Sequence, residues 1–235
     1  VQYFTCFFIA YAGCAWVLAR PRRSDVLCLG LLVLGTATAF CDLLVTPILT
    51  LGLPLACWLL EPQQRLRGGV PQCALAVGGS LCWGTGYALC WASKWVLAGA
   101  VTGQNVLTDA LHQAEVRTTA DTWHGMELTW RNIFAFLYDT LNSHHLFWPA
   151  LVVLAALVAL FILSIRSKAA LMRALPLALT ACMTPVWFVL LRTHSIQHGW
   201  FTWRALGLTL FAGLAFLYYA CDLRAARRRL KKGSI

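Results

Sequence analysis

The strongest constraint on this chain is its series of long apolar stretches, which cannot all be buried inside one small soluble domain. A helix needs about 20 apolar residues to cross a hydrocarbon layer about 30 Å thick, and somewhat shorter helices are tolerated. Apolar residues make up 60% of the 235 residues, more than a soluble interior of this size holds. The sequence therefore predicts an all-α, polytopic transmembrane helical bundle of about seven segments, at residues 1–19, 26–41, 46–60, 70–92, 148–165, 174–191 and 205–221.

The distribution of basic residues predicts how these segments are oriented. Of nineteen Lys and Arg residues, a seven-pass topology leaves only five on one face, namely Lys94, Arg117, Arg131, Arg192 and Arg204. Cytoplasmic loops of membrane proteins carry an excess of Lys and Arg. We therefore expect the other fourteen at the cytoplasmic side of a cell membrane. The basic tail, 222–235, is expected there too, bound to anionic membrane lipid rather than to nucleic acid.

We expect a single membrane domain over residues 1–235. The chain opens on Val1 inside an apolar run, without an initiator Met, which indicates the C-terminal part of a longer protein. The ten cysteines lie in or at the ends of apolar runs, so they predict neither a disulfide framework nor a zinc site. No cofactor is expected, although a divalent metal stays open, and oligomeric state is left open.

The run from residue 26 to 61 is too long for one crossing, and both of its flanks are basic, so it must turn back. Pro47 and Pro54 interrupt the helical hydrogen bonds, and a carboxylate at mid-membrane would be costly. Asp42 is therefore expected near the outer surface. It is either the N-cap of the returning helix or a functional carboxylate.

Residues 93–147 form the only sizeable region outside the predicted segments. Apolar residues recur at helical spacing in 105–118, with Asn105 as a predicted cap, and again from Met126 to Leu141. Both stretches are expected to be amphipathic helices that lie along the outer membrane surface and cover the bundle. Asp109 is a candidate general base in the first of them, or a helix-capping residue.

Glycines and tryptophans give two further predictions. Gly78, Gly79, Gly84 and Gly86 are expected where neighbouring backbones approach closely. Most of the tryptophans fall in segments expected in the outer half of the membrane protein, which is typical of an interfacial aromatic belt, although a sugar could also stack on such rings.

The stretch "RTHSIQHGWFTWR" (192–204) concentrates polar residues between two apolar segments at the predicted outer surface, where they need not be buried. Guanidinium and imidazole groups suit phosphate oxygens, so one interpretation is a lipid-phosphate or pyrophosphate cradle made by Arg192, His194, His198 and Arg204, with Lys94 beside it. The alternative is interfacial snorkelling of the arginines.

Two other chemistries stay open for the same stretch. His194 and His198 lie one helical turn apart and could bind a metal if His144, His145 or Asp139 completed the site. Ser195 is a weaker candidate nucleophile, because no oriented third member of a triad is identifiable.

Three stretches carry a resemblance: "FCDLLVTPILTLGLPL" (40–55), "WASKWVLAGAVTGQN" (91–105) and "THSIQHGWFTWR" (193–204). They resemble blocks of a group of bacterial inner-membrane proteins whose layout is similar to the C-type membrane glycosyltransferases, which use polyprenyl-phosphate sugars. The resemblance implies an outward-facing active site under an amphipathic roof. Those transferases keep their catalytic acid in the first outer loop, so its counterpart is expected upstream of residue 1, and Asp42 is not assigned that role.

The resulting functional hypothesis is transfer of a sugar from a lipid-phosphate carrier to an acceptor at the outer face. The catalytic residue is open, with Asp42 and Asp109 as candidates in this chain. The alternatives are a transporter or flippase for a lipid-linked or anionic solute, in which Asp42 would couple movement to ions, and a non-catalytic membrane assembly subunit.

Overall fold

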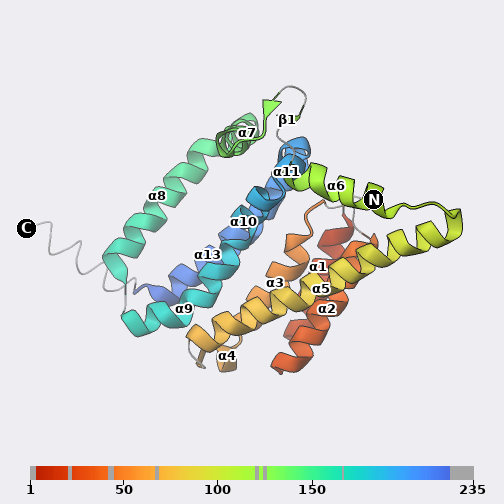
Figure 1. The fold of residues 1–235 in the computed structure, drawn as a ribbon. Helices are drawn as coiled ribbons and strands as arrows, with labels where there is room; N and C mark the ends of the chain where they lie inside the picture. The colour runs from red at the N-terminus through yellow and green to blue at the C-terminus, as the bar shows by residue number, and fades with distance from the viewer. Residues whose placement is uncertain are drawn as a thin grey trace, which may run out of the picture.

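The computed structural model shows an elongated bundle of helices (Figure 1). It describes residues 4–20, 23–41, 45–66, 69–119, 122–123, 126–165 and 167–222. The elements of the first half are α1 (Thr5–Ala19), α2 (Ser24–Cys41), α3 (Ile48–Leu59), α4 (Pro62–Leu66), α5 (Gly69–Thr102) and α6 (Leu107–Thr119). Those of the second half are β1 (Thr122–Trp123), β2 (Met126–Glu127), α7 (Trp130–Ser143), α8 (Phe147–Ser164), α9 (Lys168–Ala181), α10 (Met183–Leu190), α11 (Arg192–Gln197), α12 (Gly199–Thr202), the 3-10 helix η1 (Trp203–Ala205) and α13 (Leu206–Ala220).

The prediction of an all-α fold is confirmed. The only strands within the described residues are β1 and β2, which pair antiparallel over two residues each. Each of the seven predicted segments contains a helix, because long apolar runs satisfy their backbone hydrogen bonds internally only as helices.

The predicted number of seven membrane spans is wrong. Within the described residues, four runs are long and apolar enough to cross a membrane, at Ser24–Cys41, Gly69–Thr102, Lys168–Leu190 and Gly199–Ala220. A fifth arises if α7 and α8, which meet at a bend of 110°, are counted as one broken span. The expected spans at 1–19 and 46–60 form α1 and α3, which have 15 and 12 residues. At 1.5 Å per residue they reach about 22 and 18 Å, short of a 30 Å layer.

The helix α3 forms the centre of the core. Most of its side chains are buried, including Leu55 and Trp58 with no exposed surface. It packs against α1, α2, α5, α9, α10 and α13. Burial inside protein, rather than lipid, therefore accounts for its apolar composition.

Glycines allow α2 and α5 to cross closely. A Cβ atom at Gly35 would lie 2.0 Å from the carbonyl oxygen of Trp83, and one at Gly86 would lie 2.1 Å from that of Leu32. The predicted close approach of a neighbouring backbone is confirmed for Gly86, whereas at Gly79 a Cβ would meet only a side-chain methyl, that of Leu31, at 2.7 Å. The prediction is wrong for the two remaining predicted positions, Gly78 and Gly84, which have nothing within 4 Å.

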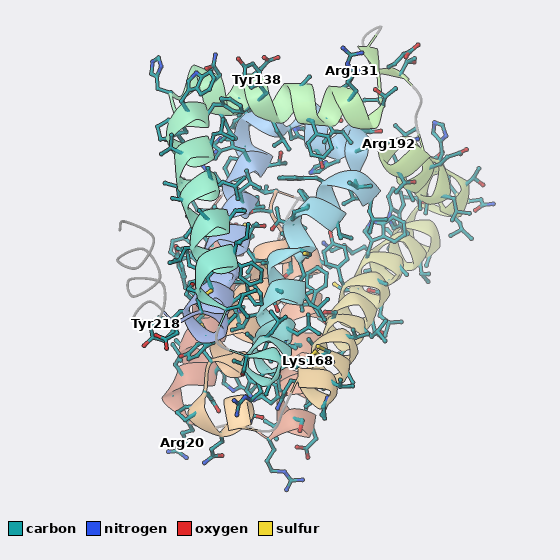
Figure 2. The ribbon with its side chains drawn as sticks, turned by 90° about the vertical axis from the view of Figure 1, so that its left-hand side faces the viewer. Arg20, Arg131, Tyr138, Lys168, Arg192 and Tyr218 are labelled. Carbon is teal, nitrogen blue, oxygen red and sulfur yellow. The ribbon has the colours of Figure 1, made fainter. Side chains whose placement is uncertain are left out.

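The two ends of the bundle differ in their residues. Figure 2 shows Arg20 and Lys168 at one end and Arg131 and Arg192 at the other, a separation that agrees with the predicted sorting of basic residues. At the Arg192 end, α6 and α7 lie across the bundle and pack against α11. The two predicted amphipathic helices thus cover this end, which we call the roofed end.

Candidate functional site

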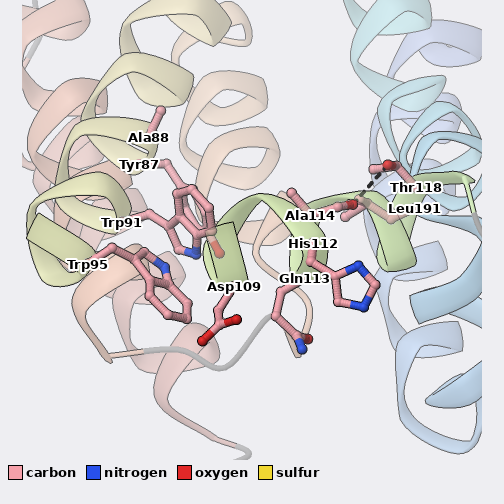
Figure 3. Close-up of a pocket in the computed structure, with 10 residues that line it drawn as sticks. All are labelled: Tyr87, Ala88, Trp91, Trp95, Asp109, His112, Gln113, Ala114, Thr118 and Leu191. Carbon is pink, nitrogen blue, oxygen red and sulfur yellow. Dashed lines mark hydrogen bonds between the residues drawn. The ribbon is translucent and has the colours of Figure 1, made fainter. Parts of the chain in front are cut away.

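A cavity lies at the roofed end, between α5 and α6. It is a pocket of about 720 Å³ lined by Tyr87, Ala88, Trp91, Trp95, Asp109, His112, Gln113, Ala114, Thr118 and Leu191 (Figure 3). The predicted span 70–92 continues as α5 to Thr102, so Tyr87, Trp91 and Trp95 lie on one continuous helix. The volume is in the range of ligand-binding pockets.

One wall of the pocket is aromatic. Tyr87, Trp91 and Trp95 are spaced by four residues on α5, so their rings share one face of the helix. The Trp91 and Trp95 rings meet edge to face at 5.9 Å, and Tyr87 stacks on Trp83 at 5.2 Å. These contacts hold the rings in place, so the wall offers fixed apolar faces on which a sugar ring can lie.

The other wall is polar and comes from α6. Asp109, His112 and Gln113 line the pocket, and Figure 3 shows Asp109 nearest to Trp95 and the His112 ring farther from the aromatic residues. The predicted cap is confirmed, since the Asn105 Oδ1 accepts a 3.2 Å hydrogen bond from the Leu107 amide. Asp109 is exposed in the first turn of α6, where the helix dipole favours a carboxylate. It can accept hydrogen bonds from ligand hydroxyl groups, and Gln113 can both donate and accept.

The stretch 192–204 packs against α6 and α7 and is exposed only in part: Gln197, Trp200 and Arg204 are exposed, whereas its first turn is buried. Thr193, His194, Ser195 and Ile196 are each at most 5% exposed. The roof explains this burial, because α6 and α7 both pack on α11. A Cβ at Gly199 would overlap the Phe136 ring of α7, which shows how closely the roof sits.

His194 and His198 lie side by side, as their one-turn spacing predicted. Their ring centroids lie 4.7 Å apart, and the His194 ring also meets Trp187 edge to face at 5.9 Å. A metal site here gains no support, since no group of three or more His, Cys, Asp or Glu side chains in the described part of the chain could hold an ion. His144, one of the proposed further ligands, instead lies 5.3 Å from the ring of Trp203.

Arg204 and Lys94 have structural partners of their own. The Arg204 guanidinium lies over the Phe201 ring at 4.6 Å and donates to the carbonyl of Trp200. The Lys94 Nζ donates to the carbonyl oxygens of Ala39 and Phe40 at the C-terminus of α2. Neither side chain lines the pocket, whereas Leu191, the neighbour of Arg192, does.

The remaining candidates have different outcomes. Asp42 lies outside the described residues. The Ser195 hydroxyl donates a 2.8 Å hydrogen bond to the Leu191 carbonyl one turn earlier, as a helical serine does without any catalytic role. Asp109 is the one predicted catalytic candidate that lines the pocket.

Sequence reasoning missed Tyr87, His112 and Gln113. Their spacing carried a usable signal, since Tyr87 continues the Trp91 and Trp95 series, and His112 and Gln113 follow Asp109 by three and four residues. Comparisons of the chain with protein-family models, with curated proteins and with solved structures found no significant match.

Proposed function

We propose that this chain is an integral membrane protein that binds a polyprenyl-phosphate-linked sugar between α5 and α6 and transfers the sugar to an acceptor hydroxyl. The roofed end would face away from the cytoplasm, and the basic end with the tail 222–235 would face it. The observation that carries the proposal is a pocket with an aromatic wall opposite a carboxylate, an imidazole and an amide.

The helix that carries the aromatic wall also has exposed apolar residues on another of its faces. Leu81, Leu89 and Val96 on α5 are more than half exposed, so they offer an apolar surface along which a polyprenyl chain can lie. The sugar would stack on Trp91 or Trp95. Arg192 is the proposed phosphate partner, because it follows the lining residue Leu191 and guanidinium suits phosphate oxygens.

Asp109 is the proposed general base of the reaction. Its carboxylate would take the proton of the acceptor hydroxyl while the hydroxyl oxygen attacks the anomeric carbon. The bond from that carbon to the phosphate oxygen breaks, and polyprenyl phosphate leaves with the electron pair. The product carries an inverted anomeric centre. Asp42 keeps its place as the other candidate in the chain.

Transport of an anionic solute has less support. Among the described residues, no Asp, Glu, Lys or Arg side chain is fully buried, and Glu61 and Arg192 are half-buried. Intramembrane ionisable residues are the usual sign of an ion-coupled pathway. The ionisable residues that line the proposed sugar pocket, Asp109 and His112, lie instead at the roofed end.

The test uses the full chain in lipid nanodiscs with a polyprenyl-phosphate-linked hexose, and with the same polyprenyl phosphate without sugar. Trp91→Ala should weaken binding of the sugar-linked lipid about tenfold, as expected for loss of a stacking surface. Trp148→Ala, a change at an exposed ring on α8, is the matched control and should leave binding unchanged. Equal binding by both variants, or no binding by the wild type, overturns the proposed site.

Turnover is measured as release of polyprenyl phosphate. Asp109→Asn should lower kcat by a factor of about 10² to 10⁴ with donor affinity retained. The control Glu127→Gln removes an equivalent charge from an exposed residue outside the pocket. Donor binding without any release by the wild type would overturn the enzymatic part and leave a lipid-linked-sugar binding protein.

A further inference from the structure

A second polar pocket lies at the opposite end of the bundle, among α4, α5, α9 and α13. It has a volume of about 300 Å³, much more than one water molecule needs. Its polar lining residues are Gln64, Gln72, Ser167, Arg173 and Tyr219. None of the residues proposed for sugar transfer lines this pocket, which we call the basal pocket.

Gln72 gives the basal pocket an unused hydrogen-bond acceptor. The side chain is 3% exposed, and its Nε2 donates to the Oε1 and the backbone carbonyl of Gln64, both at 3.2 Å. The Gln72 Oε1 is buried and accepts no hydrogen bond from the described residues. Such an acceptor is costly to leave unpaired, so the pocket favours a ligand that carries a hydroxyl or amine donor.

The other side of the basal pocket favours an anion. Arg173 contributes an exposed guanidinium, and Ser167 begins α9 by accepting the Ala170 amide, which leaves its hydroxyl hydrogen available for donation. The positive end of the α9 dipole lies at the same place. A phosphate can therefore bind Arg173 and Ser167 while a nearby hydroxyl reaches Gln72.

We infer that the basal pocket binds the phosphoglycerol headgroup of an anionic phospholipid such as phosphatidylglycerol. A soluble glycerol phosphate has the same chemistry, but the position of the pocket favours a lipid. Figure 2 shows Lys168, the neighbour of Ser167, at the same end as Arg20, and basic residues at a membrane surface attract anionic lipids. The inference does not depend on the proposed sugar transfer.

The binding test uses the purified full chain in detergent, with native mass spectrometry and thermal unfolding as readouts. Phosphatidylglycerol should bind and raise Tm in proportion to its occupancy, whereas phosphatidylcholine, which has no donor group, should not. Phosphatidic acid, which has the phosphate without the glycerol hydroxyls, should bind several-fold more weakly. Glycerol 3-phosphate that stabilises as well as phosphatidylglycerol would overturn the lipid assignment.

Variants decide which residues hold the headgroup. Arg173→Gln should weaken phosphatidylglycerol binding at least about tenfold, the usual effect of losing a charge-assisted hydrogen bond. Lys168→Gln is the matched control, because Lys168 is exposed at the same end but does not line the pocket, and its binding should stay within about twofold of wild type. Equal loss in both variants would indicate a diffuse surface charge and overturn the site.

The acceptor is tested separately. Gln72→Leu should remove the preference for phosphatidylglycerol over phosphatidic acid. If Gln72→Leu does not fold, the role of Gln72 is judged from the wild-type protein and Arg173→Gln. A wild-type protein that binds phosphatidylglycerol no better than phosphatidic acid would overturn the role of Gln72.

Discussion

The Nζ of Lys94 on α5 lies 2.7 Å from the carbonyl oxygen of Ala39 near the C-terminus of α2. It also donates to Phe40 at 3.0 Å and lies over the Phe40 ring. The last carbonyls of a helix lack partners within the helix and carry the negative end of its dipole. Lys94 therefore stabilises the end of α2, rather than forming part of the phosphate cradle predicted from the sequence.

This structural role gives the first prediction. Lys94→Met keeps most of the side-chain length but removes the ammonium, and should lower the free energy of unfolding by about 1 kcal/mol. Lys94→Arg should restore much of the loss. Thermal unfolding in one detergent measures both variants. If Lys94→Met kept its stability but no longer bound a lipid-linked sugar, Lys94 would be a phosphate ligand after all.

A second prediction compares two glycines of α5. Gly86→Ala places a Cβ 2.1 Å from the Leu32 carbonyl oxygen, so α2 and α5 must separate, at a cost of about 1–3 kcal/mol. Gly84→Ala meets nothing within 4 Å and should stabilise the helix by up to about 1 kcal/mol. Unfolding midpoints measured side by side check the opposite signs, and equal effects would contradict the α2–α5 crossing.

Much of the fold was predictable because local signals decide it. The Asn105 cap, the amphipathic helices now seen as α6 and α7, and the His194–His198 spacing all depend on residues within one or two helical turns. These predictions were confirmed.

The rest depends on contacts between distant segments. Apolar composition is the same for a helix in lipid and for α3 inside the protein, so the number of spans was overestimated. The burial of Thr193 and His194 requires the roof, and the pocket pairs Trp91 with Asp109 across a turn of the chain. These contacts join residues that are far apart in the sequence, so local sequence patterns do not predict them.

The third prediction concerns topology. Single cysteines introduced into a cysteine-free background should react with an impermeant maleimide from the outside at Thr108 on α6 and Gln197 on α11, both exposed at the roofed end. A cysteine at Lys168, at the opposite end in Figure 2, should react only after the membrane is permeabilised. If cysteines at positions 108 and 197 reacted from different sides of the membrane, the packing of α6 against α11 would be contradicted. If all three positions reacted from the sides opposite to those expected, the roofed end would face the cytoplasm.

The last prediction concerns a buried polar network that ties three helices together. The Thr50 hydroxyl of α3 donates to the Pro47 carbonyl at 2.8 Å. It accepts hydrogen bonds from Thr38 of α2 at 2.8 Å and from the Trp83 indole of α5 at 3.0 Å. Both threonines are fully buried. Loss of the Thr50 oxygen removes the acceptor of the Trp83 indole, whereas the Thr38 hydroxyl can still donate to the Leu34 carbonyl at 2.6 Å.

Thr50→Val preserves shape and removes that oxygen, and should cost about 1–2 kcal/mol of stability. Thr102→Val, at an exposed threonine that bonds within its own helix, is the matched control and should cost less than about 0.5 kcal/mol. A cycle with Trp83→Phe separates the specific bond from packing, because Thr50→Val should be less costly once the indole donor is gone. Additive effects of the two changes would mean that the hydrogen bond between Thr50 and Trp83 adds nothing measurable to stability.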